Sequence, residues 1–114
     1  HDTLVVPGCV TAAELMQAYE HGIEIVKFFP VFQMGGIETI QMLSGPFGSM
    51  RFMVTGDLNG ENFLPLLCCD KIIAAGGDWM FQEQDALKNR DFEQISRNLR
   101  NSVMRVQNMR CLKK

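Results

Sequence analysis

The stretch Ile23-Glu-Ile-Val-Lys-Phe-Phe-Pro30 predicts a β-strand that ends at its proline. Apolar and β-branched residues dominate the stretch, and proline lacks the backbone N–H that a continuing strand needs. Gly35-Gly36 follows after a short connection and opens an amphipathic helix that reaches Leu43. The sequence therefore predicts a strand–helix unit with Lys27 inside its strand.

Two more strand–helix units follow this one along the chain. Their predicted strands are Arg51–Thr55 and Lys71–Ala75, and each is closed by glycine. A helix is expected from about Asn59, where Pro65 should introduce a kink because proline lacks a backbone donor. The repeated order of strand and helix favours a parallel sheet.

The carboxyl-terminal part of the chain is predicted to be helical. A short helix is expected over Gln84–Asn89, and a long helix follows the cap at Asp91-Phe-Glu-Gln94. Apolar residues recur at helical spacing along the long helix, which predicts one packed stripe and an exposed face of arginine and asparagine. The stripe consists of Phe92, Ile95, Leu99, Val103 and Val106.

A fourth unit is predicted at the amino-terminal side. Thr3–Val6 is a β-branched run closed by Pro7-Gly8, which indicates a buried strand. Thr11-Ala-Ala-Glu14 is a capping box that starts a helix, and Gly22 provides its left-handed stop. His1-Asp2 leads straight into the strand, and we interpret this as the cut end of a longer chain.

Four strand–helix units imply an α/β fold with parallel strands and right-handed crossovers. The 114 residues are expected to form a single domain, residues 1–114. Two architectures fit the pattern. One is a flat doubly wound sheet, and the other is half of a (β/α)8 TIM barrel, which needs roughly 200 to 250 residues when complete.

Composition excludes several classes of function. Eleven basic residues against thirteen acidic ones give a net charge of −2, which argues against a nucleic-acid partner. No apolar run is long enough to span a membrane and no signal peptide is recognisable, so a cytoplasmic protein is expected. Isolated histidines and irregularly spaced cysteines predict no metal site. The cysteines are interpreted as reduced packing residues: Cys9, Cys68, Cys69 and Cys111.

Lys27 is the candidate nucleophile of the chain. Alternation along the strand places it on the same face as Ile23, Ile25 and Phe29. Apolar neighbours would desolvate its amine and favour the neutral form that attacks a carbonyl. The alternative interpretation is a lysine that protects a strand edge or extends to solvent.

Glycine turns at the ends of two predicted strands suggest a binding site. Gly56 and Gly76-Gly77 allow close approach of the backbone, as at phosphate sites, although such turns are also common without a ligand. The neighbouring Asp57 and Asp78 would repel a phosphate. Thr55 at its strand end could donate a hydrogen bond to a ligand carboxylate, although a threonine at a strand end more often bonds to the local backbone.

Together these motifs resemble those of the 2-keto-3-deoxy-6-phosphogluconate and 4-hydroxy-2-oxoglutarate aldolases. The resemblance extends from Leu4 to about Val106. The ordered motifs are Val6-Pro-Gly-Cys-Val-Thr11 with Glu14, Lys27-Phe-Phe-Pro30, Gly35-Gly36, Gly45-Pro-Phe47, Thr55-Gly56 and Gly76-Gly-Asp-Trp79. The resemblance implies that this chain supplies the last four strands of a (β/α)8 barrel, that the barrel forms a homotrimer, and that no cofactor is needed.

The resemblance also implies class I aldolase chemistry, in which Lys27 forms an imine with pyruvate or a 2-keto acid. Phe29 would pack against the pyruvyl group, Thr55 would contact its carboxylate, and the glycines would surround a distal phosphate. The implied substrate-binding positions are Phe29, Pro30, Thr55, Gly56, Asp57, Gly76, Gly77 and Asp78.

Two departures from the family pattern affect the expected substrate and activity. Asp57 stands where the family usually has glycine, and Asp78 stands where it has serine, which favours an unphosphorylated 2-keto acid. The general acid–base glutamate and an arginine for the pyruvate carboxylate belong to the half outside this chain, so the chain alone is expected to be inactive. The alternatives are a non-enzymatic half barrel that is stable only as an oligomer and a phosphate-binding barrel such as an epimerase; Lys27-Phe-Phe-Pro30 argues against the latter.

Overall fold

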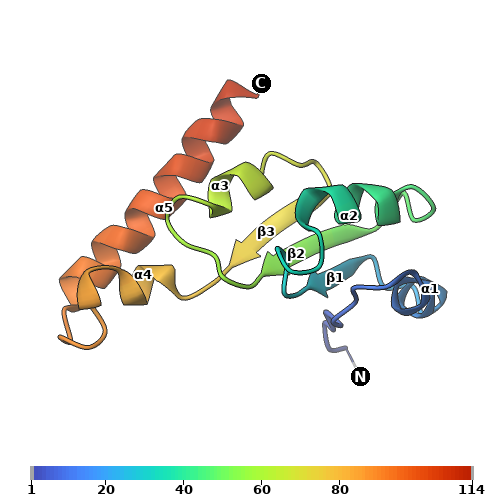
Figure 1. Cartoon of the computed structure of the whole chain (residues 1–114), viewed down its shortest axis with the longest axis horizontal. Coiled ribbons are helices and arrows are strands. Elements are labelled where there is room, and N and C mark those ends of the chain that lie inside the picture. Colours follow the sequence, from blue (N-terminus) through green and yellow to red (C-terminus); the bar gives the residue numbers. More distant parts are fainter. Residues whose placement is uncertain (1, 114) are drawn as a thin grey trace.

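The computed structural model describes residues 2–113, which form a three-stranded parallel sheet with helices around it (Figure 1). The strands β1 (Ile25–Phe28), β2 (Arg51–Thr55) and β3 (Ile72–Gly76) are hydrogen-bonded in chain order. Parallel neighbours need a crossover between them, and α2 (Gly36–Ser44) and α3 (Phe63–Leu66) lie on the two crossovers. The prediction of an α/β fold with parallel strands is confirmed at these three strands.

The two faces of the sheet have different surroundings. One face is buried under the helices, and its strand residues are Val26, Phe28, Phe52, Val54 and Ile72. On the other face Lys27, Met53 and Ala74 lie in register across the three strands. Lys27 and Met53 are exposed there. This open face therefore presents the candidate nucleophile to solvent.

The predicted strand at Thr3–Val6 is wrong. These residues form no strand, and the side chains of Leu4 and Val5 are 83% and 56% exposed. The chain first meets the sheet at Pro7. The Pro7 carbonyl oxygen accepts from the Lys27 N–H at 2.8 Å, and the Cys9 N–H donates to the Lys27 carbonyl at 2.9 Å. A β-branched run needs a hydrogen-bonded neighbour to become a strand, and the ladder with β1 does not reach upstream of Pro7.

Helix α1 (Ala12–Glu20) begins with the predicted capping box. The Glu14 N–H donates to Thr11 Oγ1 at 3.3 Å, and Glu14 Oε2 accepts from the backbone N–H groups of Val10 at 2.8 Å and Thr11 at 3.0 Å. These backbone hydrogen bonds, with one from the Thr11 hydroxyl, lower the pKa of Glu14. Gly22 has a φ of 71°, which confirms the left-handed stop after this helix.

Helix α2 begins after Gly35 as predicted, and the φ of 96° at Gly35 is a left-handed conformation that favours glycine. The helix predicted from Asn59 is shorter than expected. Asn59 Oδ1 accepts from the backbone N–H of Asn62 at 2.9 Å and forms a turn, so α3 begins only at Phe63. Pro65 lies within this single helical turn, which ends before a kink can form.

The short helix predicted at Gln84–Asn89 is also wrong. The helix here is α4 (Trp79–Gln82), followed by the 3-10 turn η1 (Glu83–Asp85). Gln84 and Asp85 have φ values of 58° and 51°, which interrupt any continuous helix. Trp79 is buried and its ring stacks on Phe63 at 5.0 Å between centroids. This tertiary contact holds the helical turn earlier in the chain than its local sequence indicates.

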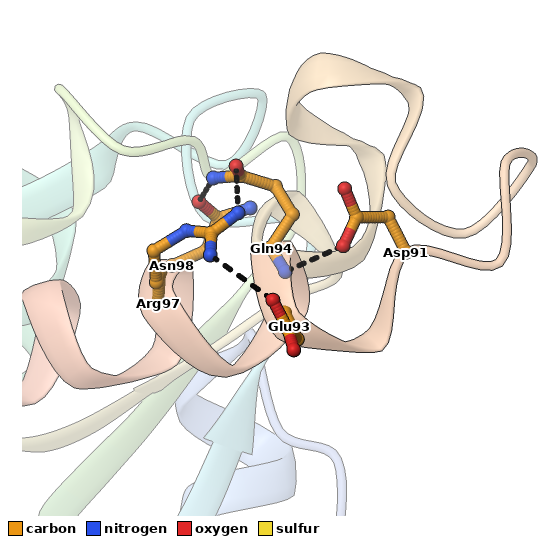
Figure 2. A network of polar contacts seen from close by, with 5 residues as sticks. All are labelled: Asp91, Glu93, Gln94, Arg97 and Asn98. Carbon is orange, nitrogen blue, oxygen red and sulfur yellow. Dashed lines mark hydrogen bonds and ion pairs between the residues drawn. The ribbon is translucent and has the colours of Figure 1, made fainter.

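Helix α5 (Phe92–Leu112) starts at the predicted cap, where Asp91 Oδ1 accepts from the Gln94 N–H at 2.9 Å (Figure 2). The packed stripe is only partly as predicted. Ile95 is buried, but Phe92 and Val103 are 71% and 53% exposed. The position that replaces them in the buried face is polar, namely Asn98.

Asn98 joins α5 to α4. Its Nδ2 donates to the Met80 carbonyl at 3.0 Å, and its Oδ1 accepts from Gln94 Nε2 at 2.8 Å (Figure 2). Arg97 lies on the exposed side of the same turn and pairs with Glu93 at 3.8 Å. The prediction of an arginine and asparagine face directed entirely to solvent is therefore wrong at Asn98, because a buried amide with both hydrogen bonds made can replace an apolar residue.

Substitution Asn98→Ala is expected to lower the free energy of unfolding by about 1–3 kcal/mol, because it leaves the partly buried Met80 carbonyl without the Asn98 donor. Asn101→Ala, at an exposed position one turn along α5, is the matched control and should change stability by less than about 0.5 kcal/mol. Urea unfolding of both variants measures the difference. Equal losses would show that Asn98 does not hold α4 and α5 together.

The cysteines are free and differ in exposure. Cys9 is buried, and burial together with the charge of Glu14 raises the pKa of its thiol. Cys69 packs partly against the core, whereas Cys68 and Cys111 are exposed. The interpretation of all four as packing residues is thus wrong for Cys68 and Cys111.

None of the helices in residues 2–113 is long and apolar enough to cross a membrane.

Candidate functional site

The three strands end at the same edge of the sheet (Figure 1). A pocket of about 570 Å³ lies at this edge. Its lining residues come from β1, β2 and β3 and from the turns that follow β2 and β3. They are Lys27, Phe29, Thr55, Gly56, Asp57, Leu58, Gly76, Gly77 and Asp78. The structure thus brings together every predicted site residue except Pro30, and it adds Leu58. Leu58 has no sequence signal beyond its place in the turn.

Lys27 projects from the open face of the sheet toward the aromatic ring of Phe29. Its Nζ lies 5.1 Å from the centroid of that ring, a cation–π contact that holds the amine at the pocket. Within residues 2–113 Lys27 is exposed and Phe29 is 54% exposed, so these residues alone do not supply the predicted shielding of the amine.

Thr55 supplies a hydroxyl without a partner. Among residues 2–113, its Oγ1 is the one buried side-chain polar atom that makes no hydrogen bond. A buried hydroxyl in that state costs about 1–3 kcal/mol, and Thr55 is one of the residues that line the pocket. The backbone of Thr55 is fixed by β2 and by the Val31 N–H, which donates to its carbonyl at 2.9 Å.

Glycine is required at the wall of the pocket where β1 and β2 end. Gly56 has a φ of 113°, and a Cβ atom at this position would lie 3.0 Å from the Cα of Pro30. Pro30 therefore supports Gly56 from behind and does not line the pocket. On β3, a Cβ at Gly76 would lie 3.3 Å from Thr55 Cγ2, and one at Gly77 would lie 2.7 Å from the ring of Trp79.

Two carboxylates line the pocket after the ends of β2 and β3. Asp57 Oδ2 accepts from Gln33 Nε2 at 2.6 Å, and Asp78 Oδ2 accepts from Gln82 Nε2 at 3.3 Å. Both donors are neutral amides. Lys27 is the one cationic residue among the nine that line the pocket. Gln33 was not predicted from the sequence, because nothing in its turn distinguishes it from an ordinary surface residue.

The acidic residues do not form a metal centre. Within the described part of the chain, no group of three or more His, Cys, Asp or Glu side chains could hold a metal ion. Glu61 lines a different hollow, beside α5, and Glu38 lies on α2 outside the pocket. What the pocket offers chemically is an amine, an unpartnered hydroxyl and two carboxylates.

Comparison with known proteins gives a family. The family model for KDPG and KHG aldolases matches residues 1–98. The 2-dehydro-3-deoxy-phosphogluconate aldolase of Dickeya dadantii is 34% identical over 99 residues, and the KHG/KDPG aldolase of Escherichia coli K12 is 33% identical over 99 residues. Each match covers 87% of this chain and 46% of the relative. The chain therefore spans about half the length of these relatives.

Solved structures give the same result. One is a KDPG aldolase from Legionella pneumophila with pyruvate captured as a covalent carbinolamine, which matches with a TM-score of 0.78 and 31% sequence identity. The match covers 86% of this chain and 47% of the Legionella chain. A Zymomonas mobilis ZM4 aldolase, with a TM-score of 0.70, 24% identity and coverage of 89% and 44%, supports the fold alone. From the match over residues 1–98 we conclude that this chain belongs to the KDPG and KHG aldolase family.

Proposed function

We propose that this chain is the imine-forming part of a class I aldolase, a carbon–carbon lyase that cleaves a 2-keto-3-deoxy or 4-hydroxy-2-keto sugar acid to pyruvate and an aldehyde. The observation that supports the proposal is the position of the Lys27 amine, which lies at a pocket with the unpartnered hydroxyl of Thr55. The relative from Legionella pneumophila, which holds pyruvate as a covalent carbinolamine, provides a second support.

In the proposed reaction the neutral Lys27 amine attacks C2 of the keto acid, and loss of one water gives a protonated imine. The C4 hydroxyl then loses its proton and the C3–C4 bond breaks. The electron pair of the C3–C4 bond moves into the imine, so an aldehyde leaves and an enamine remains. Protonation of the enamine at C3 and addition of one water release pyruvate and restore the amine. Atoms balance, because the water released at the start is consumed at the end.

The other pocket residues have roles in binding. Phe29 packs against the pyruvyl group, and Thr55 donates its free hydroxyl to the carboxylate. Pro30 acts through Gly56, which it supports from behind. The part of the enzyme outside this chain supplies a general base for the C4 hydroxyl. Proton transfer of this kind typically raises the rate about 10²–10⁴-fold. The chain by itself is then inactive.

The proposal includes the complete architecture. Residues 1–114 are one unit that contributes three βα units and the arm before them to a (β/α)8 barrel, and the barrels assemble as a homotrimer in the cytoplasm. Two findings support this arrangement: the chain spans about half of its relatives, and the open face of the sheet bears Lys27 and Met53, as the interior of a barrel would. Light scattering of the protein expressed from its complete reading frame measures the assembly.

Trapping of the imine tests the function. The protein expressed from its complete reading frame is incubated with pyruvate and sodium borohydride, and the modified peptide is identified by mass spectrometry. We expect one reduced adduct, at Lys27, that requires both reagents. Lys71 is the internal control, because its amine donates to the Gly48 carbonyl and does not line the pocket. An adduct elsewhere, or none, would refute the assignment and favour a non-enzymatic half barrel.

A further inference from the structure

We propose that Asp57 and Asp78 select substrates whose distal end is an uncharged, hydroxylated chain and exclude those with a distal phosphate. The inference rests on the proposed function, because it concerns the same pocket and the substrate bound at Lys27. It assigns specificity to the two carboxylates, whereas the site itself is defined by the amine, the cavity and the free hydroxyl of Thr55.

The order of the strands sets the direction in which the substrate extends. Lys27 lies on β1, Asp57 follows β2, and Asp78 follows β3. Neighbouring strands are about 4.8 Å apart, so the third strand lies about 10 Å from the first. A keto acid attached to Lys27 through C2 extends its remaining carbons past the end of β2, beside Asp57, toward Asp78 after β3.

Hydrogen bonds orient both carboxylates without neutralising them. Gln33 and Gln82 each donate to one oxygen, at 2.6 Å on Asp57 and 3.3 Å on Asp78. A carboxylate has about four acceptor sites, so acceptors remain for substrate hydroxyls. The left-handed backbone at Asp57, with a φ of 51°, holds its side chain in the turn beside Gly56. These groups suit a donor such as a sugar hydroxyl.

A phosphate at the same place meets a charge of the wrong sign. One lysine and two aspartates among the nine lining residues give the pocket a formal charge of −1. Backbone N–H groups in the glycine turns attract an anion, but they act as partial charges. The two carboxylates oppose it with full charges. We therefore expect the repulsion to exceed the attraction and to disfavour a phosphorylated substrate about tenfold or more.

The test compares 2-keto-3-deoxygluconate with its 6-phosphate on the protein expressed from its complete reading frame. Pyruvate release gives kcat/KM for each compound, and borohydride trapping gives the adduct yield from each at equal concentration, which needs no turnover. We expect the unphosphorylated acid to be preferred about tenfold or more, and the double variant Asp57→Asn with Asp78→Asn to shift the ratio toward the phosphate by a similar factor. Asp70→Asn, at an exposed aspartate outside the pocket, should leave the ratio unchanged.

The possible results separate this inference from the proposed function. A preference for the phosphorylated acid, or a ratio that the double variant does not change, overturns the inference while a pyruvate adduct at Lys27 still supports the aldolase. Absence of that adduct overturns both. A preference that weakens as ionic strength rises supports a charge effect, because salt screens charges at an open pocket.

Discussion

Substitution Lys27→Arg is expected to lower kcat for keto-acid cleavage by about 10³-fold or more and to abolish the pyruvate adduct. Arginine keeps the positive charge and can retain the contact with the Phe29 ring. Its guanidinium cannot be deprotonated in a protein, so it cannot attack a carbonyl. The variant therefore removes the nucleophile and preserves the local charge. Pyruvate release and borohydride trapping on the protein expressed from its complete reading frame measure the two losses.

The matched control for this experiment is Lys71→Arg. Lys71 precedes β3 and donates to the Gly48 carbonyl at 2.9 Å, a bond that arginine can also make. Cleavage should be unchanged in the control, and the urea midpoint of Lys27→Arg should stay close to that of the parent, because arginine keeps the charge and can keep the contact with the Phe29 ring. Residual cleavage above one tenth of the parent rate would show that a different group forms the imine.

Substitution Gly56→Ala is expected to lower the free energy of unfolding by about 3 kcal/mol or more. A left-handed backbone costs a residue with a side chain about 1–3 kcal/mol, and overpacking adds about 1–3 kcal/mol. Both apply here, because φ is 113° and the new Cβ would lie 3.0 Å from the Pro30 Cα and 3.2 Å from the Val31 nitrogen. These neighbours are backbone atoms, which cannot move without separating β1 from β2. Urea unfolding measures the loss.

Gly48→Ala is the control for the glycine variant. A Cβ at Gly48 would meet nothing within 4 Å, and its φ is not left-handed. The control should therefore keep the parent's stability or gain slightly, since alanine restricts the unfolded chain. If Gly56→Ala were as stable as Gly48→Ala, the close packing of the two strand ends would not be needed to form the pocket.

Short-range signals predicted the middle of the chain well. Pro30 ends β1 because it lacks a donor, Gly35 starts α2 in a left-handed conformation, and Gly22 ends the turn after α1. Each of these effects depends on one residue and its immediate neighbours. The pocket followed from the same information, because parallel strands end at one edge and bring Thr55 and Gly76 into register.

Long-range effects explain the errors. Trp79 places α4 by stacking on Phe63, sixteen positions earlier in the chain, and Asn98 is buried because Met80 needs a donor. Neither partner can be found from local periodicity. For Lys27, alternation gave the correct face of the strand but could not say what covers that face. The exposure of Lys27 therefore had to come from the structure.

The amino-terminal arm, Pro7–Cys9, has a consequence for the position of Lys27, the proposed nucleophile. Both polar groups of the Lys27 backbone bond to this arm, one to Pro7 and one to Cys9. The backbone that carries the Lys27 side chain is thus held by hydrogen bonds to a segment that does not line the pocket. Any disturbance of the arm would displace the amine relative to Thr55, although no group that touches the substrate had changed.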